Sequence, residues 1–406
     1  MNICDSSTFR SCTSCQACAA ICPHNAIVIQ LNQDGFYRPV IDDSLCVNCG
    51  LCKSVCYKYD KDFLSSPAET LKDKKLFSAW CSDEKVLKAS TSGGIADILA
   101  HHLLQKGYRV VGVVYNDNKN RAEHRVAEQP DQLIPFRGSK YIQSYTLGAF
   151  KEVIKNCREK KFAVFGTPCQ IYALSRWADK LHLRDNFFFI DIYCHGCPSI
   201  HIWEKYLDEI IQKSGHSAFD SLSFRSKKKG WGTYCVEAIV NGESAYLSKR
   251  NDKFFELFFS DYVLNDSCYD CGFRSSLEYC DIRLGDFWGS KYIGNHRGVS
   301  AVTISSARGR GLFEEINNDI VSCECDLYEF LPSQSWGKEY HINKDDREAV
   351  LNALNKEGAT IDEAIGTLRS KQGFVKSVIR NIKLILSYLP KPITDSIKRL
   401  VYKIRK

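Results

Sequence analysis

The sequence lacks two patterns that would define common classes of protein. No stretch of its 406 residues approaches the roughly 18 uninterrupted apolar residues of a membrane-spanning helix, and residues 1–10 lack the apolar core of a secretion signal. We therefore expect a cytoplasmic protein. No Gly-x-Gly-x-x-Gly follows a predicted strand, which disfavours NAD binding by a dinucleotide fold.

Acidic residues are nearly absent from the C-terminal segment. Residues 369–406 contain eleven Lys or Arg and one acid, Asp395, which gives this segment a net charge of +10. The whole chain has a net charge of +7, so the remaining residues together have a net charge of −3. Apolar residues keep helical spacing over 374–389 and again over 393–404, with Pro390 and Pro392 between them. A basic amphipathic helix pair can lie on the anionic inner face of a membrane, dock on a partner or pack on the acidic body, and the sequence leaves these alternatives open.

Cysteine is abundant, with twenty residues, and eight of them form two matching runs. In a reducing compartment, clustered cysteines indicate metal or redox chemistry and not disulfides. The runs have gaps of two, two and three residues: Cys12, Cys15, Cys18 and Cys22, then Cys46, Cys49, Cys52 and Cys56. Two-residue gaps place successive sulfurs on one loop around a 4Fe-4S cluster, while the fourth cysteine of each run ligates the other cluster.

The predicted ligation is therefore crossed, with one cluster on Cys12, Cys15, Cys18 and Cys56 and the other on Cys46, Cys49, Cys52 and Cys22. The segment between the runs is typical of strand, turn and strand. Residues 1–60 resemble the bacterial two-cluster ferredoxin, although Tyr57 stands where the first run has Pro23. The alternative, structural zinc, is disfavoured because such sites usually keep two cysteine pairs well apart.

The sequence predicts a linker over residues 57–75 and a second domain that begins at Leu76. Strands are expected at 76–80, 108–115, 162–165 and 187–193, and helices from Ile95 to Gly107 and at 146–159 and 170–181. This alternation is typical of an α/β domain, in which ligands bind beyond the carboxyl ends of strands. A β-rich segment over 219–247 contains the hairpin signal Asn241-Gly242. A helix at 252–263, a strand at 299–305 and a helix at 311–318 complete the prediction.

Six short motifs occur in this second domain: Thr91-Ser92-Gly93-Gly94, Gly138-Ser139-Lys140-Tyr141, Gly166-Thr167-Pro168-Cys169-Gln170, Cys194-His195-Gly196, Ser267-Cys268-Tyr269-Asp270-Cys271 and Gly285-Asp286-Phe287-Trp288-Gly289. In this order they resemble the beta subunit of coenzyme F420 hydrogenase/dehydrogenase over residues 76–335. The expected fold class is α+β: a bacterial-type two-cluster 4Fe-4S ferredoxin fold, an α/β flavin-binding catalytic domain, and a helical basic tail over 336–406.

The resemblance implies FAD and a third 4Fe-4S cluster. Four cysteines match the family's repeated positions and are its predicted ligands: Cys169 and Cys194 at successive strand ends, and Cys268 and Cys271 on one loop. Cys197 and Cys280 are the rival ligands, at positions where the family more often has a small residue without a thiol. The others lack ligand spacing and are interpreted as buried apolar residues: Cys4, Cys81, Cys157, Cys235, Cys323 and Cys325.

The expected flavin contacts are Thr91, Ser92, Gly93, Gly94, Ser139, Lys140 and Tyr141. Ser92, Gly93 and Gly94 open a helix, whose free N–H groups suit a diphosphate. Lys140, with Arg137 nearby, would neutralise phosphate or stabilise an anionic reduced flavin. His195 and Lys140 are the catalytic candidates. His195 is either a proton donor near the flavin or a hydrogen-bond donor to a cluster, and Asp286 either caps a helix or contacts the flavin region.

The predicted function is that of an iron-sulfur flavoprotein oxidoreductase. It would pass electrons between an organic hydride donor or acceptor, with a deazaflavin coenzyme as the candidate, and a ferredoxin-type relay. The expected partners are a redox protein or ferredoxin-like carrier and the small-molecule substrate, with no nucleic acid. The alternative is a non-catalytic electron-relay subunit of a larger redox complex.

Overall fold

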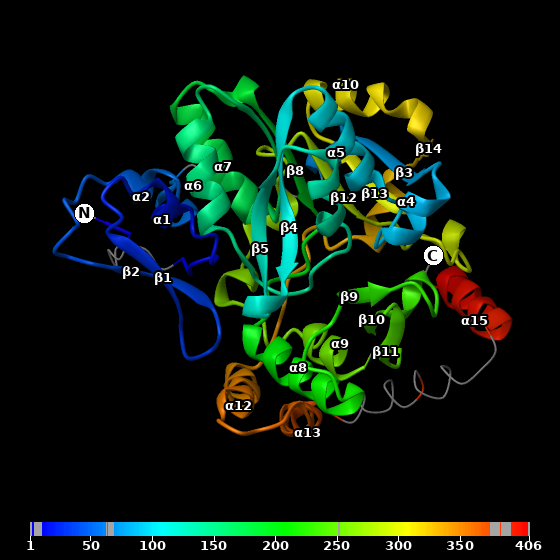
Figure 1. Cartoon of the computed structure of the whole chain (residues 1–406). Coiled ribbons are helices and arrows are strands. Elements are labelled where there is room, and N and C mark those ends of the chain that lie inside the picture. The colour runs from blue at the N-terminus through cyan, green and yellow to red at the C-terminus, as the bar shows by residue number, and fades with distance from the viewer. Residues whose placement is uncertain are drawn as a thin grey trace.

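The computed structural model describes residues 2–3, 10–61, 63, 69–250, 252–373, 382 and 391–404. Its N-terminal part contains α1 (Ala17–Ile21), β1 (Ile27–Leu31), β2 (Tyr37–Ile41) and α2 (Leu51–Ser54). The two strands pair antiparallel, which confirms the strand, turn and strand predicted between the cysteine runs. In Figure 1 this part, in blue, lies beside α6 and α7 of the main body.

The main body is built on a mixed sheet of nine strands in the order β14-β3-β13-β12-β8-β7-β4-β5-β6. The central strands β4, β7, β8 and β12 run parallel, as the predicted α/β alternation requires. Both edges of the sheet also contain antiparallel pairs. The strands are β3 (Lys75–Cys81), β4 (Tyr108–Asn116), β5 (Arg121–Ala127), β6 (Ser144–Tyr145), β7 (Lys161–Phe165), β8 (Phe187–Ile192), β12 (Ile282–Asp286), β13 (Ser300–Ile304) and β14 (Ile320–Glu324).

Helices cover both faces of this sheet (Figure 1). Phe187 and Phe189 of β8 share a core with α6 (Leu147–Asn156) and α7 (Pro168–Lys180). Phe188 and Ile190 share the opposite core with α5 (Ile95–Gln105) and α10 (Ala307–Glu315). Burial on both faces explains why this strand is a continuous apolar run. Helix α10 begins four residues before the predicted start, because the Ser306 side chain accepts a hydrogen bond from the Gly309 N–H and caps it.

A smaller antiparallel sheet lies below the large one, in the order β11-β10-β9. It consists of β9 (Ser221–Ser226), β10 (Cys235–Val240) and β11 (Glu243–Leu247) and packs against α8 (Ile200–Ser214) and α9 (Lys253–Phe258). Asn241 and Gly242 both have positive φ, 51° and 76°, which confirms the predicted hairpin turn. Three short helices complete the body outside these layers: α3 (Glu69–Lys72), α4 (Glu84–Ala89) and α11 (Leu327–Phe330).

Residues 344–371, which the sequence grouped with the tail, pack as part of the body. They form α12 (Lys344–Asn355) and α13 (Ile361–Lys371), which lie next to α8 at the bottom of Figure 1. Seven of their apolar side chains are buried in the core of α8 and α9: Val350, Leu351, Leu354, Ile361, Ala364, Ile365 and Leu368. The charged start of α12, with Lys344, Asp345 and Asp346, obscured this apolar face in the sequence.

The predicted C-terminal helix is present as α15 (Lys391–Ile404), shown in red in Figure 1. Arg399 Nη2 donates a hydrogen bond to the Ile293 carbonyl at 3.4 Å. Most of the amphipathic stretch predicted over 374–389 lies outside the described residues. Among the described residues, the helices are all too short or too polar to cross a membrane.

Two buried amide side chains join the N-terminal part to the body. Gln16 Oε1 accepts hydrogen bonds from the N–H groups of Thr146 and Leu147, at 2.9 and 3.0 Å, and so caps the first turn of α6. Asn265 Nδ2 donates to the Cys12 carbonyl at 3.0 Å. Thr146 Oγ1 donates to the Cys15 carbonyl at 2.8 Å. The backbone that carries the first cysteines is therefore fixed to the body.

Candidate metal centres and cofactor site

The eight cysteines of the N-terminal part surround two cavities. The first, of about 480 Å³ including its open mouth, is lined by Cys12, Cys15, Cys18 and Cys56. The second, of about 350 Å³, is lined by Cys22, Cys46, Cys49 and Cys52. Each set contains three cysteines of one run and the last cysteine of the other, which is the grouping that the crossed arrangement requires. Within the described residues, no three His, Cys, Asp or Glu side chains lie close enough to hold a single metal ion.

Burial and mutual repulsion act on these thiols together. Burial raises the pKa of Cys18 well above its usual value, and Cys15 and Cys12 raise it further. Burial also raises the pKa of Cys56, with the charge of Cys15 as the next cause. Four thiolates crowded in this way need a cationic core between them, and coordination to iron deprotonates them. The donor sets therefore fit two 4Fe-4S clusters.

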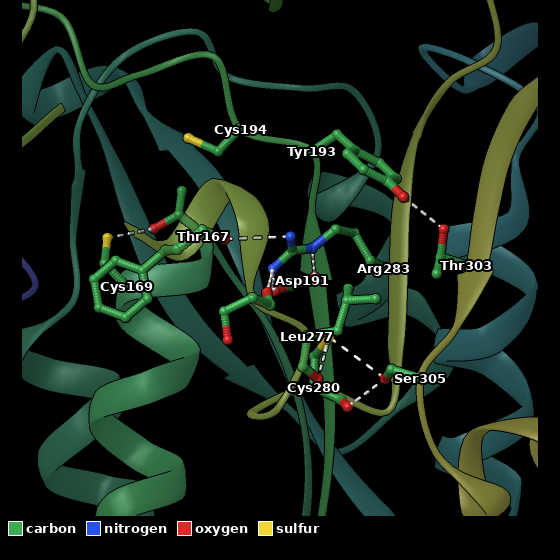
Figure 2. Close-up of polar contacts among 12 residues, drawn as sticks. Thr167, Cys169, Asp191, Tyr193, Cys194, Leu277, Cys280, Arg283, Thr303 and Ser305 are labelled. Atoms are coloured by element: carbon green, nitrogen blue, oxygen red, sulfur yellow. Dashed lines mark hydrogen bonds and ion pairs between the residues drawn. The ribbon is translucent and has the colours of Figure 1, made fainter. Parts of the chain in front are cut away.

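A third group of thiols lies at the carboxyl edge of the large sheet. Cys169 is in the first turn of α7, directly after β7, and Cys194 follows β8. Because β7 and β8 are adjacent and parallel, these two cysteines emerge at the same edge. Figure 2 shows both on one side of the sheet, with Cys169 Sγ 3.3 Å from Thr167 Oγ1.

The Cys268–Cys271 loop approaches the same place. Burial raises the pKa of Cys194, and the charges of Cys268 and Cys271 raise it further. Burial likewise raises the pKa of Cys169, followed by the charges of Cys15, Cys194 and Cys271. The four predicted ligands of a third cluster are thus close enough for their charges to influence one another.

The structure separates the two rival cysteines. The Cys197 N–H donates to Cys268 Sγ at 3.3 Å, and the charges of Cys268, Cys169 and Cys194 all act on its partly buried thiol. Cys280 instead contacts Leu277 and Ser305, on the far side of the Asp191–Arg283 pair from Cys169 and Cys194 (Figure 2). The inner group therefore contains five thiols, including Cys197.

The cysteines without ligand spacing lie apart from these groups. Four of them are buried, as predicted: Cys81, Cys157, Cys235 and Cys325. Cys323 is only partly buried, and Lys291 Nζ donates to its sulfur at 3.1 Å. Cys4 lies outside the described residues.

The three groups of thiols follow one another in space. The pKa of Cys18 is raised by the charges of Cys12, Cys15 and Cys56, which line the same cavity. It is also raised by the charge of Cys52, which lines the second cavity. Cys15 is the largest influence on Cys169 after burial. The order is therefore the second cavity, the first cavity and the inner group.

The Thr91–Gly94 loop leads into α5 as predicted. Gly94 is the N-cap of α5 with φ 83°, a left-handed conformation that favours glycine. Gly93 packs tightly against β3, because a Cβ at this position would lie 2.3 Å from the Ala79 carbonyl oxygen. The Gly93 N–H donates to Ser300 Oγ at 3.0 Å, so a protein acceptor already uses it.

Two lysines flank this loop. The Ser139 N–H donates to Thr91 Oγ1 at 2.7 Å and so joins the 138–141 loop to it. Lys140 Nζ donates to three backbone carbonyls, and burial lowers the pKa of Lys140 to about 7. Lys227 Nζ donates to the Ser92 carbonyl at 2.7 Å. Burial, and then Arg225, lower the pKa of Lys227 to about 8.

The other predicted cation, Arg137, is paired with Asp97. Its Nε and Nη2 donate to the two carboxylate oxygens at 2.8 and 3.1 Å. Neither Lys140 nor Lys227 makes such an ion pair with a described carboxylate. Two partly buried ammonium groups without a carboxylate partner make this region positive, which suits an anionic group such as a diphosphate.

Tyr141, the residue after Lys140, lies in a polar and aromatic cluster. Its hydroxyl accepts a hydrogen bond from Arg225 Nη1 at 3.0 Å. Arg225 also pairs with Asp286 at 2.6 Å, which gives Asp286 an ion-pair partner at the end of β12. The guanidinium lies 4.3 Å from the ring centroid of Tyr234.

His195 is held by the body on both sides of its ring. Nε2 lies 3.0 Å from Asp261 Oδ1, and Nδ1 lies 3.0 Å from the Tyr340 hydroxyl. The ring of Phe258 lies 5.1 Å away. These contacts fix the orientation of the imidazole next to Cys194, and a proton-donor role for it stays a prediction.

Comparison with known families covers most of the chain. Residues 11–58 match the 4Fe-4S dicluster domain. Residues 76–151 and 159–326 match the N-terminal and C-terminal parts of the coenzyme F420 hydrogenase/dehydrogenase beta subunit. The chain belongs to the family of these beta subunits. It is an F420 hydrogenase/dehydrogenase beta-subunit-like oxidoreductase with an N-terminal domain for two 4Fe-4S clusters.

Several relatives of this beta-subunit-like chain and one solved structure are similar to it. An uncharacterized protein of Methanocaldococcus jannaschii is 22% identical over 341 residues, which are 75% of this chain and 86% of that protein. A subunit of the F(420)H(2) dehydrogenase of Methanosarcina mazei is 27% identical over 40% of this chain and 47% of its own length. The coenzyme F420 hydrogenase subunit beta of Methanococcus voltae is 28% identical over 25% of this chain and 38% of its own length. A chain of the F420-reducing NiFe hydrogenase complex from Methanosarcina barkeri is 18% identical with a TM-score of 0.48, over 76% of this chain and 97% of that one.

Two residues of this beta-subunit-like body were not among the predicted site residues. The sequence favoured Cys197 as an extra thiol, yet the structure places it within the inner group. Lys227 belongs to the run Lys227-Lys228-Lys229, which resembles an ordinary charged surface. Its neighbour Lys228 does pair with a carboxylate, that of Glu237. Only the tertiary contacts distinguish the lysine that reaches the Thr91–Gly94 loop.

Proposed function

We propose that this chain is an iron-sulfur flavoprotein oxidoreductase that moves electrons between an organic hydride donor or acceptor and a ferredoxin-type relay. The observation that supports the proposal is that Cys15, at the first cavity, and Cys169, of the inner group, pack against the same core, and that the charge of Cys15 acts on Cys169. The family supports FAD as the second cofactor, and the names of two relatives support a deazaflavin coenzyme as the candidate substrate.

The inner group would hold the third 4Fe-4S cluster on Cys169, Cys194, Cys268 and Cys271. A cluster there would carry single electrons between the flavin and the first cavity, in whichever direction the reaction runs. Cys49, in the second cavity, is exposed, so the series ends at the surface. When bound, FAD supplies the conversion between a two-electron hydride transfer and one-electron steps.

Lys227 would bind the diphosphate of FAD at the Thr91–Gly94 loop, and Lys140, whose three N–H bonds already go to carbonyls, would add positive charge. Both have a pKa lowered by burial, and a nearby anion would favour their charged forms. Gly94 is left-handed, and Gly93 lies so close to the Ala79 carbonyl that a side chain would not fit there, so the two glycines fix the path of the loop.

A relay subunit in a larger redox complex is the second candidate. Exposed apolar side chains gather on the N-terminal part, on the two strands and on the loop that carries Cys46: Val28, Leu31, Val40, Leu45 and Val47. Val47 also lines the second cavity. We call this set the apolar ferredoxin surface, and it would be the contact for a protein electron carrier under either candidate function.

Val47→Glu is expected to weaken electron transfer to a protein carrier about tenfold. Val47 is 60% exposed beside the second cavity, and a carboxylate there would have to be desolvated at the interface. Reduction of the protein by a small-molecule donor should not change. Stopped-flow reduction of a candidate ferredoxin measures the effect. Val321→Glu, a 44% exposed position on β14, is the matched control, and an equal loss there would contradict a specific surface.

Anaerobic purification with cofactor extraction tests the proposed function. We expect about twelve iron atoms with matching sulfide, and FAD. A screen of reductants, including the reduced deazaflavin coenzyme, should then bleach the flavin band with one of them. Full cluster content without any flavin would favour the relay subunit, and zinc in a colourless sample would overturn both candidates.

A further inference from the structure

Three arginine side chains are buried in the described part of the chain: Arg225, Arg274 and Arg283. Arg225 pairs with Asp286 and Arg283 pairs with Asp191, both at 2.6 Å. Arg274 is 5% exposed and makes no ion pair with any described carboxylate. Asp261, an acid of the same neighbourhood, is directed to His195 at 3.0 Å and Lys338 at 3.9 Å.

The guanidinium of Arg274 is fixed beside the inner thiols. Arg274 lies in the 3₁₀ turn Gly272–Ser275, which directly follows Cys271. Its Nη2 donates to the Cys268 carbonyl at 2.6 Å and to the His195 carbonyl at 2.9 Å. Arg274 is thus held against the carbonyl of one predicted ligand, Cys268, and against that of His195, the residue after Cys194.

The remaining contacts of Arg274 leave one donor without a partner. Nη1 donates to the Lys338 carbonyl at 3.0 Å, and the guanidinium lies 4.2 Å from the ring centroid of Tyr340. Nε is buried and has no hydrogen-bond partner. A buried cation with an unused donor and no carboxylate is strongly unfavourable unless another anion compensates it.

The anions available to Arg274 are the inner thiolates. The hydrogen bonds to the carbonyls of Cys268 and of His195, the residue after Cys194, hold the guanidinium beside these thiols. A 4Fe-4S cluster held by four thiolates has an overall charge of about −2 when oxidised. Such a group would supply both the missing charge and sulfur acceptors for a donor of Arg274.

We propose that Arg274 is the counter-charge of the inner 4Fe-4S cluster and raises its reduction potential. This inference rests on the third cluster of the proposed function. Reduction adds one electron and takes the cluster with its thiolates from about −2 to about −3, with no proton transferred and no bond broken. A fixed cation in a buried site stabilises the more negative form, so the electron is held more strongly at the inner position.

The test is a redox titration of the purified full-length protein, followed by electron paramagnetic resonance. Arg274→Met is expected to lower the reduction equilibrium constant of the inner cluster at least tenfold, which is about 59 mV for one electron. Arg274→Lys retains the charge and should shift the potential by much less. Lys338→Met removes a cation 4.5 Å from the same Tyr340 ring, but its side chain is 45% exposed, so solvent screening should keep that shift small.

Each outcome decides the inference. An unchanged potential in Arg274→Met with the inner signal intact would overturn it, as would an equal shift in Arg274→Lys. If Arg274→Met loses the inner cluster and Arg274→Lys keeps it, the positive charge is required and the inference stands. Loss in both variants would show that packing on Tyr340 matters and not charge. A wild-type protein with only about eight iron atoms would instead remove the third cluster of the proposed function.

Discussion

Cys268→Ser is expected to lower the iron content from about twelve atoms to about eight while both ferredoxin clusters remain. Cys268 lies on the loop that approaches Cys194, and its sulfur accepts the Cys197 N–H at 3.3 Å. A serine hydroxyl is a poor substitute, because iron-sulfur clusters select soft thiolate ligands. If the protein binds the proposed flavin, electron exchange between it and the ferredoxin clusters should be lost with the inner cluster. Iron analysis together with electron paramagnetic resonance measures both effects.

Two further cysteine variants define the ligand set. Cys280→Ser is the matched control, because this buried thiol contacts Leu277 and Ser305 away from the inner group, and it should retain all three clusters. Cys194→Ser should also lose one cluster unless Cys197, the fifth thiol of the group, replaces it as ligand. Full iron content in Cys268→Ser would contradict the proposed ligands.

Arg283→Met is expected to lower the free energy of unfolding by about 3–5 kcal/mol. Arg283 and Asp191 form a buried bidentate pair between β12 and β8, with contacts of 2.7 and 2.6 Å (Figure 2). Arg283 also donates to the Ser276 carbonyl at 2.8 Å, just beyond the Cys268–Cys271 loop. Methionine fills similar volume but leaves the Asp191 carboxylate buried without a counter-charge. Denaturant unfolding under anaerobic conditions measures the loss.

The loss in Arg283→Met should depend on pH in one direction. Burial raises the pKa of Asp191, and Arg283 opposes that effect in the native protein. Without Arg283 the folded-state pKa lies further above the unfolded value, so the destabilisation is greatest at high pH. It should shrink as the pH falls through that raised pKa, since a neutral acid needs no counter-charge. The double variant Asp191→Asn with Arg283→Met should recover much of the stability, and a loss that is the same at every pH would contradict the explanation.

Local sequence patterns were sufficient for much of the fold. The hairpin between the cysteine runs, the strands at Leu76, Tyr108, Phe162 and Phe187, and the turn at Asn241-Gly242 all lie where they were predicted. The start of α10 and the packing of residues 344–371 were not predicted from the sequence. Charged residues dominate both segments, and their apolar faces become apparent only against the partners that bury them.

The sequence by itself determined the two ferredoxin clusters, because gaps of two and three residues place thiols together whatever the rest of the chain does. It also determined the family, through six short motifs in a fixed order. Only the tertiary structure decided which distant thiols meet. Strands β7, β8 and β12 are neighbours through parallel pairing although more than eighty residues separate β8 from β12, and this brings the 268–271 loop to Cys169 and Cys194. The same arrangement includes Cys197, excludes Cys280 and leaves Arg274 without an ion pair to any carboxylate in the described ranges. Strand order and burial arise from packing between segments far apart in the chain, and no spacing within one segment encodes them.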